Sequence, residues 1–348
     1  MKKEHILVIR FSALGDVAMV VPVVWALAHQ YPDIRITVLS RKFARPLFDD
    51  LAPNVNFMEA DLKTEYHGVI GLNALYRRLT AKQFTKIADL HNVLRSEYLR
   101  MRFNLGRYRV EHIHKHRGQR RKLVKNKIKQ QLPTSFESYA EVFERLGYPI
   151  DIKQFKSIFP EEGGNLNLLP KEIGPKKNFE QWIGIAPFAA HEGKIYHPRL
   201  MEQVIFQLIQ KYPNVRIFLF GMGENENKYF PIWAAQYHQC QSVQRYCEGM
   251  YQELILMSHL NVMLSMDSAN MHLASLAGIP VVSVWGATHP MAGFLGFNQE
   301  TDNAIQIDLE CRPCSIFGNK PCRRGDYACL QNIPPERIVE RITSLINN

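Results

Sequence analysis

Short apolar runs alternate with longer amphipathic stretches along this chain of 348 residues, and that alternation restricts its fold more than any other feature. In the first half, the runs that predict strands lie at residues 5–10, 35–39, 56–60, 67–71 and 86–90. In the second half, they lie at residues 182–186, 215–220, 262–266 and 281–285. Strands that alternate with helices favour parallel sheets joined by right-handed crossovers. The sequence therefore predicts an α/β protein with one parallel sheet in each half.

A stretch rich in proline and glycine, residues 158–180, separates the two halves and is typical of a linker. We therefore expect a first Rossmann-like domain at residues 1–165 and a second one at residues 176–334. The pattern of residues 335–348 predicts a C-terminal helix that packs back onto a sheet, with the sheet of the first domain as a candidate.

The segment R-F-S-A-L-G-D, residues 10–16, lies between the first predicted strand and an apolar helix. Open α/β sheets bind ligands at the carboxyl ends of their strands, where this turn belongs. Asp16 is therefore either a helix cap or a carboxylate that faces a cleft. Ser12 and Gly15 border the same turn and are candidates to orient a phosphate or an acceptor.

A second strand-to-helix turn lies at V-M-L-S-M-D-S-A-N-M-H, residues 262–272. Asp267 and Ser268 come directly after the strand, and His272 lies one turn into the helix. Backbone N–H groups at a helix start suit a phosphate. From these residues alone, the alternative of a capping aspartate with a surface histidine is equally good.

Five blocks of the sequence resemble glycosyltransferase family 9, the bacterial ADP-heptose:lipopolysaccharide heptosyltransferases. Two of them are S-A-L-G-D near the N-terminus and D-S-A-N-M-H-L-A-S-L-A-G-I-P near the C-terminus. The others are D-L-H-N-V-L-R-S at residues 89–96, I-A-P-F-A-A-H-E-G-K-I-Y-H-P-R at 185–199 and F-L-F-G-M-G-E-N-E at 218–226. They occur in the family's order along nearly the whole chain, which makes the resemblance specific.

The resemblance implies a GT-B type fold, with two Rossmann-like domains that face a cleft, and an inverting transfer of a heptose or similar sugar from an ADP-sugar to the lipopolysaccharide inner core. Asp16 matches the family's catalytic base. Lys194 matches a lysine that meets the diphosphate. Asp267, Ser268, Ala269 and His272 match the donor-binding turn.

Two further assignments are looser. The family's ribose-binding acid matches Glu224 better than Glu226, because the local spacing departs by one residue. Arg95 is expected on the acceptor side, with an ordinary surface arginine as the alternative.

Two alternative functions stay open. Ala189 and Ala190 stand where heptosyltransferases often carry hydroxyl groups, so another nucleotide sugar or acceptor is one alternative. A non-catalytic module that binds nucleotides or glycans is the other, although both Asp16 and Lys194 are present. A dinucleotide-dependent oxidoreductase is disfavoured, because no G-x-G-x-x-G follows either first strand.

Positive charge is concentrated at the start of the chain. The first 165 residues carry 28 lysines and arginines against 17 acids, and residues 107–129 alone carry ten, with three histidines. This basic segment favours an anionic membrane surface or an acidic glycolipid acceptor over a plain solvated loop. No stacking platform or recognition motif supports nucleic-acid binding. The sequence begins on a strand without a secretory pattern, so we expect a cytoplasmic protein, peripheral on the inner membrane.

Four of the six cysteines form the pattern C-x2-C-x7-C-x6-C, at Cys311, Cys314, Cys322 and Cys329. A structural zinc is one interpretation, and reduced thiols or occasional disulfides are the other. The sequence shows no pair of carboxylates of the kind that would predict a catalytic metal site. We therefore expect no required cofactor, with Mg²⁺ at most carried by the diphosphate of the donor.

Overall fold

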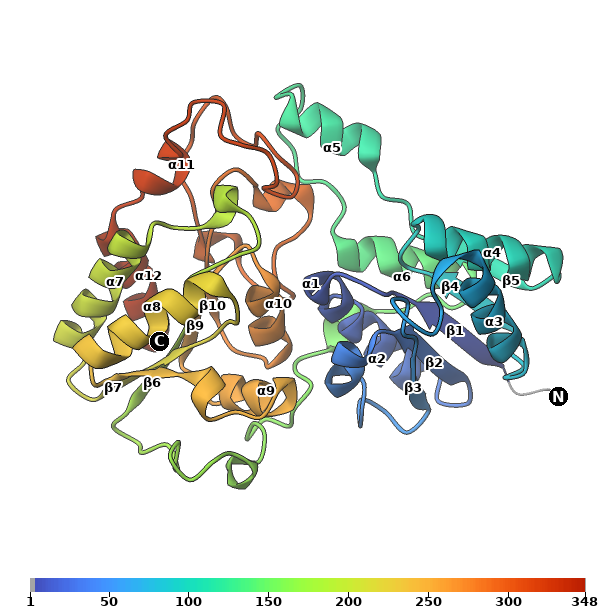
Figure 1. Cartoon of the computed structure of the whole chain (residues 1–348), viewed down its shortest axis with the longest axis horizontal. Helices are drawn as coiled ribbons and strands as arrows, with labels where there is room; N and C mark the ends of the chain where they lie inside the picture. The colour runs from blue at the N-terminus through green and yellow to red at the C-terminus, as the bar shows by residue number, and fades with distance from the viewer. Residues whose placement is uncertain (1–3, 348) are drawn as a thin grey trace. The chain divides into compact units, whose positions relative to one another are not determined.

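The computed structural model describes residues 4–347 and divides them into two compact units (Figure 1). One unit contains the described residues up to Lys115 together with Thr134–Lys156. The other contains His116–Pro133 and the described residues from Ser157 onward. The chain thus passes between the units three times, where the sequence predicts a single linker. No helix within residues 4–347 is long and apolar enough to cross a membrane.

The first unit is built on a parallel sheet of five strands in the order β3-β2-β1-β4-β5. The strands are β1 (His5–Ile9), β2 (Arg35–Ser40), β3 (Val55–Glu59), β4 (Lys86–Asp89) and β5 (Arg109–His112). The central strand β1 is buried along its whole length, as expected for a sheet covered on both faces. The strand order reverses between β1 and β4, so the loops after these two strands meet at a topological switch point.

Helices cover both faces of this sheet (Figure 1). Helices α3 (Gly68–Thr80) and α4 (Leu94–Leu105) share one core cluster with Leu7 and Ile9. The alternate side chains of β1 face the other side, where α2 (Val21–Gln30) packs against α6 (Ser135–Arg145). The short helix α1 (Leu14–Ala18) follows β1 directly.

The second unit has a parallel sheet of six strands in the order β11-β10-β9-β6-β7-β8. The strands are β6 (Gln181–Ala186), β7 (Val215–Leu219), β8 (Cys240–Ser242), β9 (Val262–Met266), β10 (Val281–Val284) and β11 (Ala304–Ile305). Strand order again reverses next to the first strand of the unit, between β6 and β9. The loops after β6 and β9 therefore meet at the second switch point.

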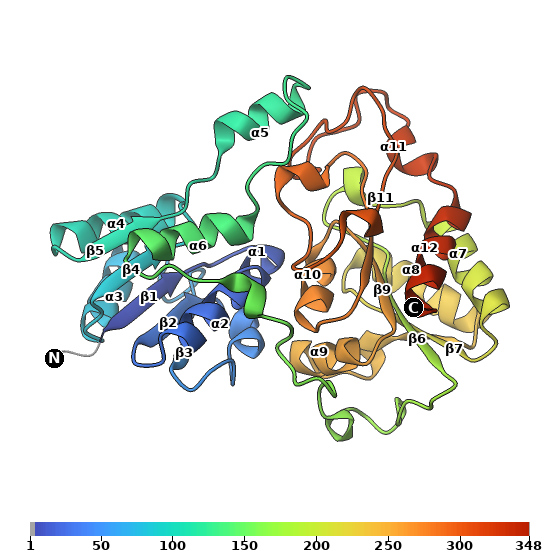
Figure 2. The ribbon, with the colours of Figure 1, turned by 180° about the vertical axis from the view of Figure 1, so that it is seen from behind.

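The helices of the second unit are α5 (Arg117–Val124), α7 (Pro198–Lys211), α8 (Glu224–Gln236), α9 (Met250–Ser258), α10 (Ala269–Leu276), α11 (Ala328–Gln331) and α12 (Pro335–Ile346). The C-terminal helix α12 packs against α7 and against the sheet of its own unit, and both ribbon views show it beside α7 (Figure 2). Its buried residues Ile338, Val339 and Ile342 belong to the same core cluster as those of α7 and α8. The helix therefore packs on the sheet of its own unit, where the sequence left the sheet of the first domain as a candidate.

One predicted strand in the first half is wrong, and one observed strand was not predicted. Residues 67–71 begin α3 instead of forming a strand, with Val69 65% and Ile70 89% exposed. A short apolar run cannot be distinguished from the start of a helix by periodicity. The fifth strand is β5, whose one apolar residue, Val110, lies between polar residues, and all its residues are at most half-buried, so no apolar run marks it.

Residues 116–129 of the basic segment also belong to a different part of the fold from the one expected. Residues 116–133 belong to the second unit, where Leu123 and Leu132 pack with Ala292. The guanidinium of Arg120 lies 4.5 Å from the centre of the Phe294 ring. The boundary at residue 165 therefore differs from the observed division, because these apolar contacts place α5 on the second unit.

Candidate active site

Asp16 lies in the first turn of α1, just beyond the carboxyl end of β1. Its Oδ2 lies 2.5 Å from Nη2 of Arg10 and accepts a hydrogen bond of 3.2 Å from the backbone N–H of Ala13. Within the described residues, both contacts use Oδ2, and the side chain keeps 33% of its surface exposed. Asp16 therefore caps its helix and still presents carboxylate surface to solvent.

Arg10 is the buried partner that holds this carboxylate. Its Nη1 donates a hydrogen bond of 2.8 Å to the carbonyl of Leu90, and its guanidinium lies 5.9 Å from the ring centre of Tyr139. Burial opposes the charged form, but the neighbouring Tyr139 and Asp16 raise the pKa of Arg10 above its usual value. A buried, charged guanidinium therefore holds the carboxylate of Asp16 in place.

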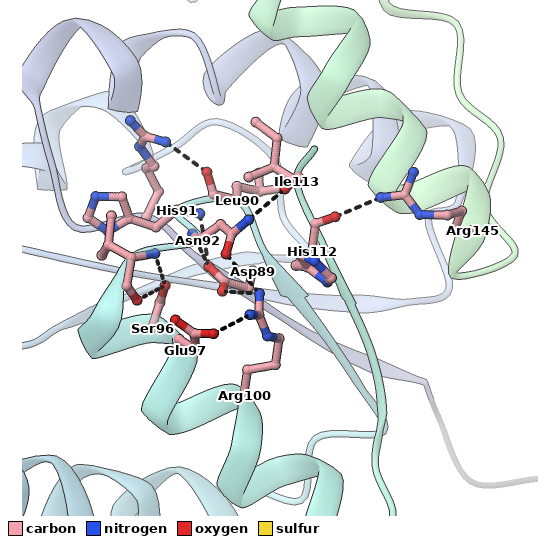
Figure 3. Close-up of polar contacts among 12 residues, drawn as sticks. Asp89, Leu90, His91, Asn92, Ser96, Glu97, Arg100, His112, Ile113 and Arg145 are labelled. Carbon is pink, nitrogen blue, oxygen red and sulfur yellow. Dashed lines mark hydrogen bonds and ion pairs between the residues drawn. The ribbon is translucent and has the colours of Figure 1, made fainter. Parts of the chain in front are cut away.

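The loop from β4 to α4 lies next to the turn after β1, and Figure 3 shows the polar contacts within this loop. Asp89 is fully buried and accepts hydrogen bonds of 2.9 Å from the backbone N–H groups of His91 and Asn92. Arg100 pairs with the same carboxylate at 3.2 Å and donates to the side-chain oxygen of Asn92, also at 3.2 Å. These contacts fix the loop that carries His91.

His91 lies against the turn after β1. Its Nδ1 lies 3.5 Å from the backbone nitrogen of Phe11, and its Nε2 lies 3.5 Å from Oγ of Ser12. Burial and the charges of Arg10 and Lys115 lower the pKa of His91 to about 3. The ring is therefore neutral near pH 7.

The remaining residues predicted for the acceptor side differ in burial. Ser12, Gly15 and Asp16 are half-buried in one turn, whereas Arg95 is an exposed residue of α4 whose charge still contributes to the low pKa of His91. The structure thus gathers Ser12, Asp16 and His91 at the ends of β1 and β4. Sequence reasoning missed His91, although it lies in the block D-L-H-N-V-L-R-S and follows a predicted strand.

In the second unit, Lys194 and Asp267 form an ion pair. Nζ of Lys194 lies 2.9 Å from Oδ2 of Asp267, and the two side chains are 16% and 5% exposed. Lys194 ends a single 3-10 turn in the loop after β6, and Asp267 follows β9. The hydroxyl of Thr288 donates a hydrogen bond of 2.7 Å to the same Oδ2. Thr288, which sequence reasoning missed, comes from the loop after β10.

The other predicted donor residues lie at the start of α10. Ser268 is the N-cap residue, and its Oγ lies 3.2 Å from Oγ of Ser265. Ala269 is the first residue of the helix, and His272 is buried one turn further on. The structure therefore groups Lys194 and Asp267 with a helix N-terminus whose first N–H groups can receive a phosphate.

Glu224 and Glu226 occupy different positions at the start of α8. Glu224 is exposed, whereas the half-buried Glu226 folds back over the glycine turn that precedes the helix. A Cβ placed on Gly221 would lie 2.7 Å from Oε1 of Glu226, and Gly221 has a φ of +131°. The structure thus brings Glu226 over the turn, although Glu224 is the residue that the sequence favours. The role of each acid stays a prediction.

The four C-terminal cysteines line one small cavity but do not form a ready metal centre. Among residues 4–347, no group of three or more histidine, cysteine, aspartate or glutamate side chains is arranged to hold a metal ion. All four thiols are free. The thiols are therefore not arranged, among the described residues, in a geometry that would coordinate zinc.

Two open parallel sheets, each with a switch point that carries polar residues, define a GT-B-like α/β protein. The sequence profile of glycosyltransferase family 9 (heptosyltransferase) matches residues 72–323. The chain belongs to glycosyltransferase family 9, and it is a heptosyltransferase-like enzyme.

Similar proteins cover almost the whole chain. Lipooligosaccharide heptosyltransferase 2 of Campylobacter jejuni is 22% identical over 339 residues, which are 96% of each chain. A family 9 glycosyltransferase of Veillonella parvula superposes with a TM-score of 0.73 at 16% identity, and covers 100% of this chain and 98% of the other. The E. coli heptosyltransferase WaaC with ADP superposes with a TM-score of 0.68 at 16% identity, and covers 98% and 99%. The fold expected from the sequence is thereby confirmed.

Proposed function

We propose that the protein transfers a heptose from ADP-heptose to the acidic inner core of a lipopolysaccharide, with inversion at the anomeric carbon. The observation that carries this proposal is the buried ion pair of Lys194 and Asp267 beside the start of α10. A lysine held next to a helix N-terminus suits a diphosphate, and WaaC, with the same fold, has been solved with ADP.

Asp16 is the proposed base. As the acceptor oxygen attacks the anomeric carbon, its proton passes to the carboxylate of Asp16, and the bond from that carbon to the ADP oxygen breaks. A carboxylate that does this work must reach the substrate hydroxyl. The partial exposure of Asp16 supports this role, while Arg10 and Ala13 hold its Oδ2.

Lys194 is the proposed partner of the leaving group. Negative charge grows on the diphosphate as ADP departs, and a fixed cation lowers the energy of that charge. Asp267 pairs with this lysine and positions it, and Thr288 donates a hydrogen bond that holds Asp267 in place. Ser268, Ala269 and His272 complete the donor turn, and an acid at the start of α8, Glu224 or Glu226, binds the ribose.

The acceptor assignment rests on charge and on relatives. The Campylobacter relative is a lipooligosaccharide heptosyltransferase, so its acceptor is a glycolipid. On this chain, exposed cations of α5 such as Arg117, Arg121 and Lys122 form a basic surface on the second unit. Such a surface suits the anionic inner face of a membrane, where the acceptor glycolipid would lie. Work at that surface implies a cytoplasmic, peripheral protein.

The test is a transfer assay with ADP-heptose and a lipopolysaccharide inner-core oligosaccharide that lacks its outer heptoses. We expect release of ADP, a product longer by one heptose and an inverted anomeric centre by NMR. The same assay with UDP-, GDP- and CMP-sugars tests the second candidate, another donor, which Ala189 and Ala190 in the loop after β6 favour. Transfer from one of those donors alone would contradict the ADP-heptose assignment.

A further inference from the structure

The outward face of α4 is apolar. Leu94, Met101 and Leu105 are 85%, 49% and 75% exposed, and their spacing of seven and four residues aligns them along one side of the helix. Leu99 and Phe103, on the opposite side, pack in the core of the first unit. The outward side of a helix that covers a sheet is ordinarily polar, so an apolar stripe there marks a surface for interaction.

The neighbouring helix α3 extends this stripe. Its first turn carries Val69 and Ile70, which are both exposed. The two helices lie side by side (Figure 1), and Nη1 of Arg102 in α4 donates a hydrogen bond of 2.8 Å to Oδ1 of Asn73, one turn after Val69 and Ile70. We call the exposed apolar residues of both helices the apolar face, which consists of Val69, Ile70, Leu94, Met101 and Leu105.

The exposed charges of this part of the chain are almost all positive. Within residues 67–110, six exposed side chains are cations, and Glu97 is the one exposed acid. Oε1 of Glu97 lies 3.5 Å from Nη2 of Arg100, so its charge is already paired. The exposed cations are Arg77, Arg78, Lys82, Arg95, Arg107 and Arg109. Apolar side chains together with an excess of arginine and lysine are typical of segments that lie in a membrane interface.

We propose that the apolar face inserts into the head-group layer of an anionic lipid bilayer, while the surrounding arginines contact lipid phosphates. Leucine and isoleucine side chains gain free energy when they leave water for the acyl boundary, and guanidinium groups pair with phosphate oxygens. A second copy of the chain fits this face less well, because a symmetric contact would bring its cations against their own counterparts. The occupant is therefore a lipid surface.

One end of the apolar face lies next to the candidate site of the first unit. Leu94 is the first residue of α4, and the loop before it carries His91, which lies against Ser12. An acceptor glycolipid in the same bilayer would therefore present its sugar close to this loop. This consequence rests on the proposed function, whereas the insertion itself does not. Helix α5, by contrast, carries no exposed large apolar side chain among its described residues, so it contributes charge alone.

The first experiment measures insertion directly with a tryptophan in the apolar face. Leu94→Trp is mixed with phosphatidylglycerol vesicles whose acyl chains carry bromine, which quenches a tryptophan only on contact. The spectrum of the wild type, which has four tryptophans, is subtracted. We expect the fluorescence of the new tryptophan to shift to the blue and to be quenched. The matched control is Ile232→Trp, at a position of α8 that is 52% exposed, and it should show neither change.

The second experiment removes the apolar side chains and measures vesicle affinity. The triple variant is Ile70→Gln, Leu94→Gln and Leu105→Gln, all at exposed helical positions. Affinity should fall at least about 100-fold, because each side chain inserted into the acyl boundary strengthens binding about tenfold. The factor should be equal at low and high salt, since salt screens charges and not apolar contacts. The matched control exchanges three exposed apolar residues of the second unit for glutamine, at Leu168, Phe206 and Ile232, and should bind like the wild type.

Three results would overturn the proposal. The first is a tryptophan at position 94 that the brominated lipid does not quench, because the protein would then touch head groups only. The second is an equal loss of vesicle affinity in the two triple variants. The third is a dimer of the wild type in sedimentation that the Ile70, Leu94 and Leu105 variant dissociates, since a second copy would then cover the face.

A third experiment tests the consequence for transfer. The triple variant of the apolar face should transfer heptose more slowly than the wild type to an acceptor glycolipid in vesicles, and equally fast to the water-soluble core oligosaccharide. Equal rates of variant and wild type on both acceptors would contradict the link between insertion and the acceptor. Absence of transfer by the wild type to either acceptor would count against the proposed function and leave the insertion result standing.

Discussion

Nη2 of Arg10 lies 2.5 Å from Oδ2 of Asp16, and the same arginine donates to the carbonyl of Leu90. One buried guanidinium therefore links the turn after β1 to the loop after β4, the two loops that meet at the switch point of the first sheet. Among the described residues, both of these contacts use Oδ2 of Asp16, so the carboxylate is oriented while its other oxygen takes part in neither contact.

Asp16→Asn should lose transfer activity and keep donor binding. The amide cannot accept the proton of the acceptor hydroxyl, so we expect kcat to fall by about 10² to 10⁴. Turnover is measured with ADP-heptose and acceptor, and ADP affinity is measured by calorimetry. The control is Asp33→Asn, an exposed aspartate of the same unit, which should change neither. Normal turnover of Asp16→Asn would remove Asp16 from the mechanism.

Asp267→Asn should destabilise the second unit more than the loss of one hydrogen bond would. Lys194 would be left largely buried without its partner, at a cost of about 3 kcal/mol. The double variant Lys194→Met with Asp267→Asn should then lose less than the sum of the two single changes. Urea unfolding of all four proteins measures this coupling. Additive changes would show that the ion pair does not stabilise the fold, and Lys211→Met, at an exposed position, is the matched control.

The protein should lose stability below pH 6.5 through His91. Its pKa is about 3 in the folded protein and about 6.5 when unfolded, so the unfolded chain binds the extra proton as the pH falls. The free energy of unfolding then decreases by about 1.4 kcal/mol per pH unit below pH 6.5, or about 2 kcal/mol at pH 5. Above pH 6.5, His91 is neutral in both the folded and the unfolded protein, so it causes no loss of stability there.

His91→Gln tests that contribution. Urea unfolding at pH 7 and pH 5 should show a smaller decrease in this variant than in the wild type. His67→Gln, at an exposed position of the same unit, should behave like the wild type. If the free energy of unfolding decreased equally in all three proteins between pH 7 and pH 5, His91 would not be the cause of the pH dependence.

Neutralising α5 should weaken membrane binding without affecting ADP. Replacement of Arg117, Arg121 and Lys122 by glutamine removes three exposed charges, each worth about 1 kcal/mol at an anionic surface, so affinity for phosphatidylglycerol vesicles should fall about 100-fold. Arg120 is left in place because it packs on Phe294.

The control for α5 replaces Lys171, Lys177 and Lys211, three exposed lysines of the same unit. It should bind vesicles almost as the wild type does. An equal loss in both triple variants would mean that overall charge, and not α5, attracts the membrane. Binding that does not weaken with salt would contradict an electrostatic contact altogether.

Much of the fold follows from the sequence because buried parallel strands are continuous apolar runs. Strands such as β1 and β9 are buried at every residue, and the sequence predicts both. Prediction from the sequence fails for segments that are only partly buried. The edge strand β5 has no apolar run, and the run that begins α3 carries Val69 and Ile70, which are exposed.

The candidate site, like the fold, follows from the sequence only in part. The strand-to-helix turns after β1 and β9 identify Asp16 and Asp267, since ligand-binding residues of open sheets lie there. Thr288 comes from the loop after β10, whose sequence carries no specific signal, whereas His91 lies in the block D-L-H-N-V-L-R-S, which marks the loop but does not single out the histidine. The position of α5 depends on contacts such as that between Leu123 and Ala292, which are far apart in the sequence, so composition alone could not assign it to a domain.

The assignment of Lys194 to an ADP-sugar site is tested most directly by calorimetric titration of the protein with ADP, UDP, GDP and CMP, repeated on Lys194→Ala. We expect ADP to bind selectively and Lys194→Ala to weaken ADP binding at least about tenfold, because the diphosphate loses a fixed cation. Preference for another nucleotide, or ADP binding that does not change in Lys194→Ala, would contradict the assignment of this site to an ADP-sugar.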